Sequence, residues 1–469
     1  MQRTKAMHTP SAAESAAKKL FFAHALLPGG WARDVVLTIE NGAIAAVADN
    51  SSSAGAEIVS GVALPGMPNL HSHAFQRGMA GLTELRGETQ DSFWTWRQLM
   101  YRFIDTLTPD DVEAVAAYAY AEMLEGGFTS VAEFHYLHHD EHGAPYADLA
   151  EMASRIASAC VETGIGLTLL PVFYNYSGFG GAAPVHGQRR FINDPGRFLA
   201  LLEHSRDAIR PVADAAIGIA PHSLRAVTPE TLGEVLKAVP AGSVHMHIAE
   251  QVKEVEDCVA WSGRRPVEWL LDHVAVDRRW VLIHATHLTP EEAAGIAEAN
   301  AVVGLCPLTE ANLGDGIFEG PRLIEAGGVF GVGSDSNIEI SALGELKQFE
   351  YSQRLHHRVR NAVGRRSGES TGRALYEHAL AGGAQASGRA IGALAVGKRA
   401  DIVVLDDTNP DLCGVSGDRW LDAATFVAGN SAIARVYVGG RQVVESGRHL
   451  KRGDITERYR RVVKRLAGL

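Results

Sequence analysis

The sequence predicts an α/β protein, a (β/α)8 barrel of the TIM type with a small β-sandwich domain built from both termini. Three observations support this fold. Apolar runs alternate with helical patterns through the middle of the chain, hairpin patterns mark its two ends, and metal-binding residue types follow four of the apolar runs. A chain of 469 residues is also too long for one ordinary core. We expect a disordered lead-in over 1–19, the sandwich over 20–62 plus 388–469, and the barrel over 63–387.

The barrel is predicted from eight apolar segments that helical patterns separate. Among the helical patterns are 110–125, 148–163, 229–239 and 290–299. A doubly wound open sheet is the alternative fold, but it would not so naturally bring the first, fifth, sixth and eighth strands to one point. The expected strands lie at 62–70, 128–135, 165–173, 215–221, 243–248, 280–285, 301–306 and 329–334.

The sandwich is predicted from hairpin patterns at the two ends of the chain. Residues 35–40 and 43–47 are strand-like and flank an Asn-Gly pair, which favours a tight hairpin turn. Residues 400–406 and 434–444 repeat this pattern of strands and glycine turns. Because no such pattern returns in between, we expect both ends to contribute to one small domain.

Composition limits the classes of function. Charged residues make up 21% and hydrophobic residues 46%, as in an ordinary globular enzyme, and the net charge of −11 argues against a nucleic-acid partner. We expect no membrane span, because no apolar run reaches 18 residues, and the first 19 residues lack the apolar core of a signal peptide. The four cysteines are widely spaced, which favours a reducing, cytoplasmic location. A homodimer is expected on base rates.

Histidines at two strand ends are the first candidates for metal ligands. His71 and His73 lie two residues apart, so strand alternation places both on one face of the chain. A lone His-x-His pair is weak evidence, but His247 at the end of the fifth strand adds a third candidate. His245 lies further down the same strand, where a core or supporting role is expected.

Three further residues have the chemistry of a hydrolytic site. Glu250 follows His247 by three residues and can move protons between a water and a leaving nitrogen, although an acidic residue there also suits a helix N-terminus. His284 can ligate metal or, unligated, hydrogen-bond the attacking water. Asp335 ends the eighth strand and is either a hard oxygen ligand or a helix cap. Together, the order and placement predict a metal-dependent hydrolase.

This set of segments resembles the amidohydrolase superfamily, and residues 391–406 resemble its return from barrel to sandwich. The lysine that bridges two metals in binuclear members is absent from the third and fourth strands. The resemblance therefore implies one divalent ion held by His71, His73, His247 and Asp335. Zinc (Zn2+) is the first expectation, and Fe2+ or Mn2+ are alternatives that these ligand types do not separate.

A more specific resemblance is to the formimidoylglutamate deiminases within that superfamily. It covers nearly the whole chain from residue 20, and it implies hydrolysis of N-formimino-L-glutamate to N-formyl-L-glutamate and ammonia in histidine degradation. One departure is Asn337, where the pattern leads us to expect a histidine two residues past the metal aspartate. The segments that carry the resemblance are 67–77, 91–97, 133–139, 222–225 and 309–316.

A small dianionic substrate of this kind needs fixed cations, and the planar guanidinium group suits carboxylates. We expect Arg97 and Arg225 to bind it, with Gln76 and Tyr136 completing the cage. For Arg97 the alternative is a surface arginine on a helix. His222 either contacts substrate or supports Arg225.

The expected mechanism uses a divalent ion that lowers the pKa of water toward 7. Asp335 takes a proton, His284 steadies the oxygen of the tetrahedral adduct, and Glu250 delivers a proton to nitrogen so that ammonia departs. One alternative is another aminohydrolase of the same fold, acting on a purine, pterin or triazine ring. A second is a metal-free scaffold that has lost catalysis.

The remaining features have simpler interpretations. The glycine-rich segment 174–190 lacks the phosphate-loop pattern and is expected to be a mobile loop over the site, with Arg189 and Arg190 in solvent. His287 is expected to be structural. Four paired histidines lie away from the strand ends and are expected to be exposed: His138, His139, His356 and His357.

Overall fold

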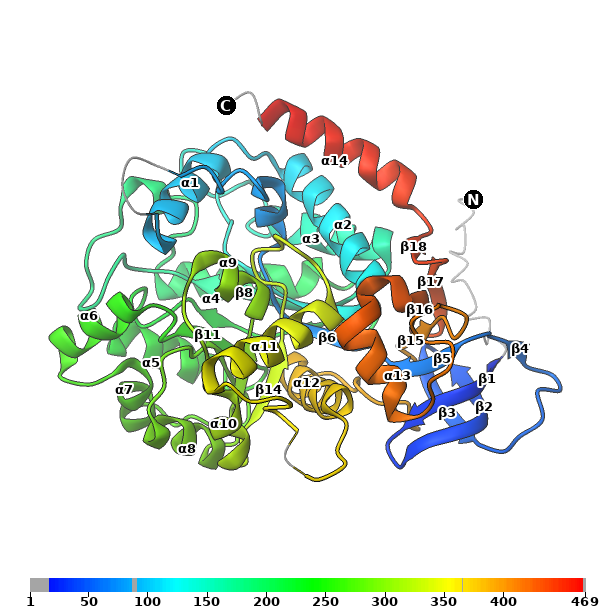
Figure 1. Ribbon diagram of the computed structural model, residues 1–469. Coiled ribbons are helices and arrows are strands. Elements are labelled where there is room, and N and C mark those ends of the chain that lie inside the picture. The colour runs from blue at the N-terminus through cyan, green and yellow to red at the C-terminus, as the bar shows by residue number, and fades with distance from the viewer. Residues whose placement is uncertain (1–16, 87–90, 365, 467–469) are drawn as a thin grey trace, which may run out of the picture.

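The computed structural model of the chain describes residues 17–86, 91–364 and 366–466. A barrel occupies the middle of the sequence, and a smaller β-rich part made from both ends lies beside it (Figure 1). Most of the lead-in expected over 1–19 falls outside the described residues, and strand β1 begins at Lys18. Within the part of the chain that is described, no helix has the length and apolar character needed to cross a lipid bilayer.

The barrel is a closed ring of parallel strands, which confirms the predicted fold class. Its strands form two sheets in the orders β10-β8-β7-β6, with β9 on β8, and β11-β12-β13-β14. Parallel bridges between Ile219 and Val244 and between Ser72 and Asp335 join the two sheets at both seams. The strands are β6 (Met67–Ser72), β7 (Phe128–His135), β8 (Gly166–Phe173), β9 (Ala216–Ile217), β10 (Ala220–Pro221), β11 (Val244–Ile248), β12 (Trp280–His284), β13 (Val302–Leu305) and β14 (Val329–Val332).

Two expected strands are each divided in the structure. The segment 62–70 holds β5 (Val62–Pro65), which pairs with β1 and β15 of the other sheet, and β6 of the barrel. Gly66 separates them, and a Cβ atom there would lie 2.3 Å from the Thr129 side chain. The prediction of one strand was wrong because an apolar run looks the same whether it serves one sheet or two. The segment 215–221 is likewise divided into β9 and β10.

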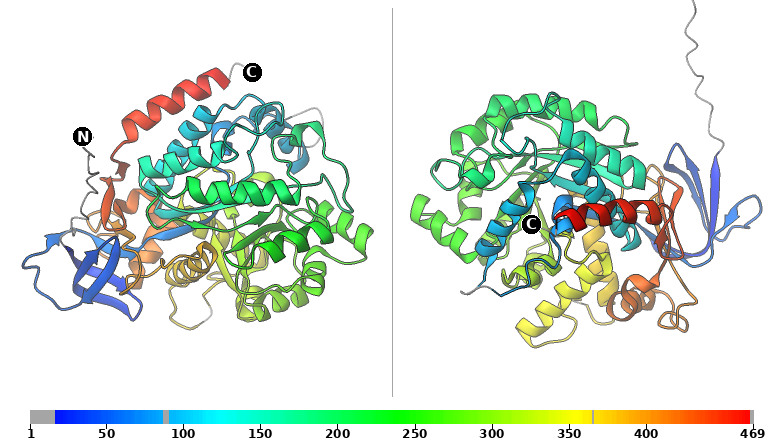
Figure 2. Two further views of the ribbon diagram at one scale, coloured as in Figure 1. Left: turned by 180° about the vertical axis from the view of Figure 1, so that it is seen from behind. Right: turned by 90° about the horizontal axis from the view of Figure 1, so that it is seen from above.

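Helices surround the strands, as the view from above shows (Figure 2). The four expected helical intervals correspond to α2, α3, α5 and α8. In α2, α5 and α8 a threonine accepts the backbone N–H three residues later and a proline follows it, a strong helix-start signal. The barrel helices are α1 (Phe93–Ile104), α2 (Pro109–Glu125), α3 (Glu151–Thr163), α4 (Pro195–Ala208), α5 (Pro229–Ala238), α6 (Val252–Ser262), α7 (Pro266–His273), α8 (Pro290–Glu298), α9 (Pro307–Leu313), α10 (Gly320–Glu325), α11 (Ala342–His357) and α12 (Thr371–Ser387).

The β-sandwich unites the two ends of the chain in one nine-stranded sheet of order β18-β17-β16-β15-β5-β1-β2-β3, with β4 on β1. An apolar cluster separate from the barrel core is formed by side chains of β1, β2 and β15, such as Phe22, Leu37 and Ile402. The strands are β1 (Lys18–Leu27), β2 (Gly30–Glu40), β3 (Ala43–Ala48), β4 (Glu57–Ile58), β5, β15 (Ile402–Leu405), β16 (Ile433–Val438), β17 (Arg441–Glu445) and β18 (Arg448–His449).

The C-terminal interval also contains helices α13 (Asp418–Ala423) and α14 (Arg452–Leu466). Helix α14 lies along barrel helix α2 (Figure 1). Tyr459 stacks on Tyr118 with ring centroids 3.8 Å apart, and the Arg452 guanidinium group lies 3.1 Å from the Glu122 carboxylate. We therefore propose two domains, the sandwich domain over 20–62 plus 388–469 and the barrel domain over 63–387. Helix α14 belongs to the sandwich domain in sequence but packs on the barrel.

Helix α12 packs closely against the two strands that meet at one seam, β6 and β14. It approaches through two glycines, because a Cβ atom on Gly382 would lie 2.0 Å from the Phe330 carbonyl oxygen and one on Gly383 2.9 Å from Pro68. His71 lies near the end of β6 and Asp335 follows β14, so this helix packs behind the seam that carries two of the expected ligands.

We expect Gly382→Ala to lower the free energy of unfolding by about 1–3 kcal/mol, because the added methyl group forces the helix away from the barrel. The matched control is Gly233→Ala in α5, where a Cβ atom meets nothing within 4 Å. That change should stabilise slightly, by less than about 1 kcal/mol. Urea unfolding measures both, and equal effects of the two substitutions would contradict the close approach.

Candidate active site

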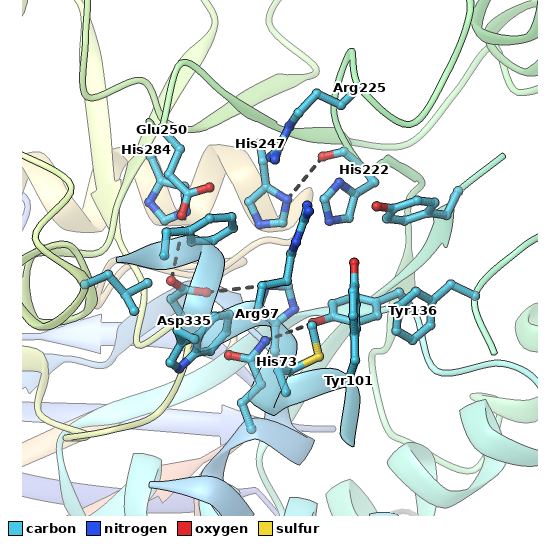
Figure 3. Close-up of a pocket in the computed structure, with 17 residues that line it drawn as sticks. His73, Arg97, Tyr101, Tyr136, His222, Arg225, His247, Glu250, His284 and Asp335 are labelled. Carbon is cyan, nitrogen blue, oxygen red and sulfur yellow. Dashed lines mark hydrogen bonds and ion pairs between the residues drawn. The ribbon is translucent and has the colours of Figure 1, made fainter. Parts of the chain in front are cut away.

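A pocket opens at the C-terminal ends of the barrel strands. Every residue expected at the site lines it except His71, which is fully buried. Figure 3 shows His73, His247, His284, Glu250 and Asp335 gathered on one side of this space. The location agrees with the rule that barrel enzymes place their chemistry at this end.

Three imidazoles and one carboxylate converge at the bottom of the pocket. Asp335 Oδ1 lies 3.3 Å from His71 Nε2 and 3.4 Å from His73 Nε2. His247 Nε2 lies 3.1 Å from His71 Nε2. These separations are close to the roughly 3.3 Å expected between two ligand atoms that are each about 2.0–2.1 Å from a tetrahedral ion.

Backbone carbonyl groups fix the orientation of two of the rings. His73 Nδ1 donates to Phe134 O at 2.9 Å, and His247 Nδ1 donates to His222 O at 3.1 Å. With the ring proton on Nδ1, each Nε2 presents a bare lone pair to the cluster, as metal-ligating histidines require.

The protonation states of the cluster also fit a metal ion. Burial lowers the pKa of His71 to about 3 and that of His247 well below its usual value, so these rings are neutral at pH 7. Burial alone would raise the pKa of Asp335, but its hydrogen bond with His71 and the nearby imidazoles hold that pKa well below the usual range. Neutral imidazoles and an ionised carboxylate are the forms that bind a divalent cation.

Glu250 and His284 form a second pair of groups above this cluster. His284 Nε2 lies 3.8 Å from Glu250 Oε1 and 3.9 Å from Asp335 Oδ2, while His284 Nδ1 contacts Glu310 Oε1 at 3.2 Å. Burial opposes a charge on His284, but Glu250 and the other carboxylates raise its pKa to about 10. Burial raises the pKa of Glu250 to about 7, against the opposing charges of His284 and Arg225. A carboxyl group with a pKa near neutrality is well suited to transfer protons.

The backbone at these strand ends is left-handed at residues that are not glycine. The φ angles are 50° at Ala249, 66° at His284 and 43° at Asp335. Such conformations cost about 1–3 kcal/mol each and cluster at functional sites. Here they turn the chain sharply where β11, β12 and β14 end, and two of the strained residues carry site side chains.

Asn337, the one departure from the family pattern, is fully buried between two ligand-bearing turns. Its Nδ2 donates to Ser72 Oγ at 3.2 Å, to His73 O at 3.1 Å and to Asp335 O at 3.0 Å. The amide thus links the turns after β6 and β14 through their backbones.

Two arginines face the outer part of the pocket. Arg97 on α1 is partly buried and Arg225 is buried, and their guanidinium groups lie 4.6 and 5.7 Å from the Trp94 ring. The Nε atoms of both are buried without a hydrogen-bond partner among the described residues. Arg225 is only loosely paired, with Nε 3.9 Å from Glu254 Oε1. Buried donors without partners are costly, so the pocket favours a ligand rich in acceptors.

Gln76, Tyr136 and His222 also lie where the sequence places them. Gln76 Nε2 donates to the Tyr136 hydroxyl oxygen at 2.9 Å, while Gln76 Oε1 is buried without a described partner. His222 lines the pocket, and its carbonyl oxygen orients His247. His222 therefore orients a candidate metal ligand through its backbone and faces the pocket with its side chain.

Four of the histidine and arginine predictions were wrong. Arg189 does not lie free in solvent, because its side chain is largely buried and pairs with Asp105 at 2.9 Å. His138 and His139 are buried rather than exposed, with Nε2 atoms that donate to Val172 O and Ile192 O, each at 3.0 Å. Arg190 is fully buried and not in solvent, because it donates to the carbonyls of His139, Leu107 and Ile104. The side chains of His138, His139 and Arg190 lie away from strand ends and are surrounded by backbone carbonyl groups from other segments. Nothing in the local sequence indicates such an environment.

Other predictions about single residues fit the structure. His245 is a core residue whose Nε2 donates to Ala386 O at 3.0 Å. His287 is partly buried, and its backbone N–H donates to Ala249 O at 3.1 Å, so it supports the turn after β11. His356 and His357 are partly exposed and pair with Glu319.

Several pocket residues were not predicted. Tyr101, Tyr174, Phe191 and Trp96 line the outer wall, and Glu310 orients His284. Aromatic residues on a helix or loop resemble ordinary core residues in sequence. Glu310 lay within the family-like segment 309–316 but had no role assigned.

The fold and the site define a metal-dependent hydrolase, and comparison with known families supports this class. The amidohydrolase family model matches residues 62–443, and the model described as the N-terminal domain of formimidoylglutamate deiminase HutF matches residues 19–59. The chain belongs to the amidohydrolase family.

Within that family the chain belongs with the formimidoylglutamate deiminases. It is 52% identical to the formimidoylglutamate deiminase of Pseudomonas aeruginosa strain PAO1, over 92% of this chain and 95% of that protein. It is 28% identical to a 5-methylthioadenosine/S-adenosylhomocysteine deaminase of Halobacterium salinarum, over 81% of this chain and 82% of that protein. A crystal structure of an amidohydrolase from Brucella melitensis matches with a TM-score of 0.92 and 51% identity, over 96% of this chain and all of that one.

If His71, His73, His247 and Asp335 hold a metal ion, we expect His247→Ala to lose it. Elemental analysis after dialysis should show about one divalent ion per wild-type chain and a small fraction of that in the variant, because one of four ligands is gone. The matched control is His245→Gln on the same strand, which should keep its metal. Equal metal content in His247→Ala and the wild type would contradict the ligand assignment.

Proposed function

We propose that the protein hydrolyses N-formimino-L-glutamate to N-formyl-L-glutamate and ammonia, as a step of histidine degradation. The observation that carries this proposal is one pocket that combines a cluster of metal-ligand type with two buried guanidinium Nε atoms that lack a protein acceptor. A linear amidine attached to a dicarboxylate satisfies both parts of that pocket. The 52% identity to a protein named for this activity supports the same substrate.

His71, His73, His247 and Asp335 would hold the metal, and we propose one ion per chain. A divalent ion bound there supplies Lewis acidity, which lowers the pKa of water toward neutrality. Three imidazoles with one carboxylate suit Zn2+, with Fe2+ and Mn2+ as alternatives. The single-ion stoichiometry is supported by the sequences of β8, β9 and β10, which contain no lysine to bridge a second ion.

Asp335, His284 and Glu250 supply the proton transfers of the proposed reaction. Asp335 accepts a proton from the attacking water, whose oxygen bonds to the formimino carbon. The His284 imidazolium, which lies between the carboxylates of Glu250 and Asp335, donates a hydrogen bond to that oxygen. Glu250 gives a proton to the terminal nitrogen and then takes up the hydroxyl proton of the adduct, while the proton held by Asp335 passes to the same nitrogen. The carbon–nitrogen bond then breaks, the formyl group forms, and ammonia leaves instead of an amide anion.

The arginines would bind the carboxylates and thereby position the formimino group. Arg97 and Arg225 offer planar donors to a dianion, and Gln76 and Tyr136 add hydrogen-bonding groups nearer the cluster. A purine, pterin or triazine ring offers no negative charge for the two guanidinium groups. The intact ligand cluster also argues against a metal-free scaffold.

We also propose a homodimer in a reducing cytoplasm. All four cysteines carry free thiols, three of them buried, as expected where disulfides do not form. Two-fold dimers are the commonest assemblies among soluble homo-oligomers. Light scattering on the purified protein tests the dimer directly.

The first test is ammonia release by metal-loaded protein from N-formimino-L-glutamate, with guanine, adenosine and cytosine in parallel. We expect release from the glutamate derivative alone. Release from a nucleobase or nucleoside instead would move the assignment to another aminohydrolase.

Glu250→Gln should lower kcat by about 10²- to 10⁴-fold, because the variant cannot shuttle protons. Its metal content should equal that of the wild type, and Glu256→Gln, an exposed change on α6, serves as the control. Wild-type turnover in Glu250→Gln would remove Glu250 from the mechanism.

Arg97→Met should raise KM for N-formimino-L-glutamate by about 10- to 100-fold, as expected when a charge-assisted hydrogen bond is lost. Arg102→Met, an exposed change on the same helix, should leave KM unchanged. Steady-state kinetics distinguishes the two, and equal KM values for both variants would return Arg97 to the role of a surface helix arginine.

A further inference from the structure

The outer wall of the pocket contains a hydrogen-bonded group that sequence reasoning missed. Gln188 is 1% exposed and lies in the glycine-rich segment after β8. Its Nε2 donates to the Tyr174 hydroxyl oxygen at 2.8 Å and to the Tyr101 hydroxyl oxygen at 3.4 Å. Both tyrosines line the pocket and are nearly buried.

The orientation of the Gln188 amide is fixed by the backbone. The Val185 N–H donates to Gln188 Oε1 at 2.9 Å, and only the oxygen of the amide can accept that bond. The NH2 group must therefore face the tyrosines. Since it has two hydrogens, one is available for each hydroxyl oxygen.

This arrangement determines what the two hydroxyl groups can offer a ligand. Each oxygen accepts from Gln188, so each O–H proton is left for another acceptor. Among the described residues, neither hydroxyl of Tyr101 or Tyr174 donates to a protein group. Burial raises the pKa of Tyr174 despite the nearby arginines, so it keeps its proton at neutral pH. The wall thus presents two hydrogen-bond donors.

The same side of the pocket carries positive charge. The Arg97 guanidinium group lies 5.8 Å from the centroid of the Tyr101 ring. In Figure 3 the Tyr101 hydroxyl and the Arg97 guanidinium group are at the end of the pocket where His222 lies. Two neutral donors beside a cation form a cradle for a carboxylate.

A single ring, that of His222, lies between the two tyrosines' donor site and the cluster of candidate metal ligands. The His222 ring lies 4.8 Å from that of His247 and 4.5 Å from that of Tyr174, so it separates Tyr174 from the reacting centre. In N-formimino-L-glutamate the main-chain carboxylate is close to the formimino nitrogen, and the side-chain carboxylate is further away. The spacing suits the more distant group.

We propose that Tyr101 and Tyr174, polarised by Gln188, form a subsite for the side-chain carboxylate of the substrate, with Gln188 as a positioning residue. This inference rests on the proposed function and assigns part of its specificity. It also gives the segment 174–190 a role in recognition, because Gln188 ties that segment to α1 through Tyr101. Gly187 permits the close packing, since a Cβ atom there would lie 2.6 Å from the Tyr101 ring.

The test measures KM and kcat of metal-loaded protein with three substrates. These are N-formimino-L-glutamate and its two monoamides, one with the side-chain and one with the main-chain carboxylate replaced by a carboxamide. Tyr174→Phe and Tyr101→Phe should each raise KM for the dianion by about 10-fold with a much smaller change in kcat. With the side-chain monoamide the same variants should change KM by less than about 2-fold, because the anion they bind is already missing.

The role of Gln188 is tested by coupling. Gln188→Met should raise KM for the dianion in the wild-type background but not in the Tyr101→Phe/Tyr174→Phe background, where no hydroxyl remains to be oriented. A merely structural role would give the same change in both backgrounds. Thermal midpoints establish that each variant is folded, and the tyrosine variants decide the subsite if Gln188→Met does not fold.

Two failures are distinguishable. If the wild type releases no ammonia from N-formimino-L-glutamate, the proposed function is wrong. If the wild type is active but the tyrosine variants have the wild-type KM for the dianion, the subsite assignment is wrong. It is also wrong if the rise in KM of these variants disappears with the main-chain monoamide and not with the side-chain monoamide.

Discussion

The structure depends on bringing candidate metal ligands from three parts of the barrel together inside a buried space. His71, His247 and Asp335 come from both sheets of the barrel, and His71 Nε2 lies 3.1 Å from His247 Nε2 and 3.3 Å from Asp335 Oδ1. This arrangement requires the barrel to close, and it does so at the seam where Ser72 bridges Asp335. The glycines of α12 let a helix support that seam from outside, and Asn337 joins the two turns from inside. The contacts that close the barrel therefore also position the side chains of the site.

Burial divides the titratable groups of the site into distinct roles. The histidines of the cluster are kept neutral, and Asp335 is kept ionised. Glu250 is brought to a pKa of about 7, while His284 is kept protonated by surrounding carboxylates. In the proposed reaction these side chains would serve as a ligand cluster, a proton shuttle and a cationic hydrogen-bond donor in one pocket. The outer wall adds hydrogen-bond donors without protein acceptors, the Nε atoms of Arg97 and Arg225 among them. Such donors favour an anionic substrate.

The sequence predicted the elements whose signal is local and periodic. The strand ends carrying His71, His247 and Asp335, and the helical intervals between the strands, follow from the spacing of apolar residues. The division of 62–70 at Gly66 was missed because an apolar run does not state which sheet it joins. Buried polar residues such as Arg190 and His138 were missed because the carbonyls that surround them come from distant segments. Gln188 was missed for the same reason, since its partners Tyr101 and Tyr174 come from other parts of the chain and meet it only when the protein is folded.

The most direct test of the ligand cluster is anomalous X-ray diffraction from crystals of the metal-loaded protein. Our account predicts one strong peak per chain, about 2.0–2.2 Å from Nε2 of His71, His73 and His247 and from a carboxylate oxygen of Asp335. It also predicts that Glu250 and His284 stay outside bonding distance of that peak. A peak elsewhere, a second peak beside the first, or ligation by Glu250 would contradict it.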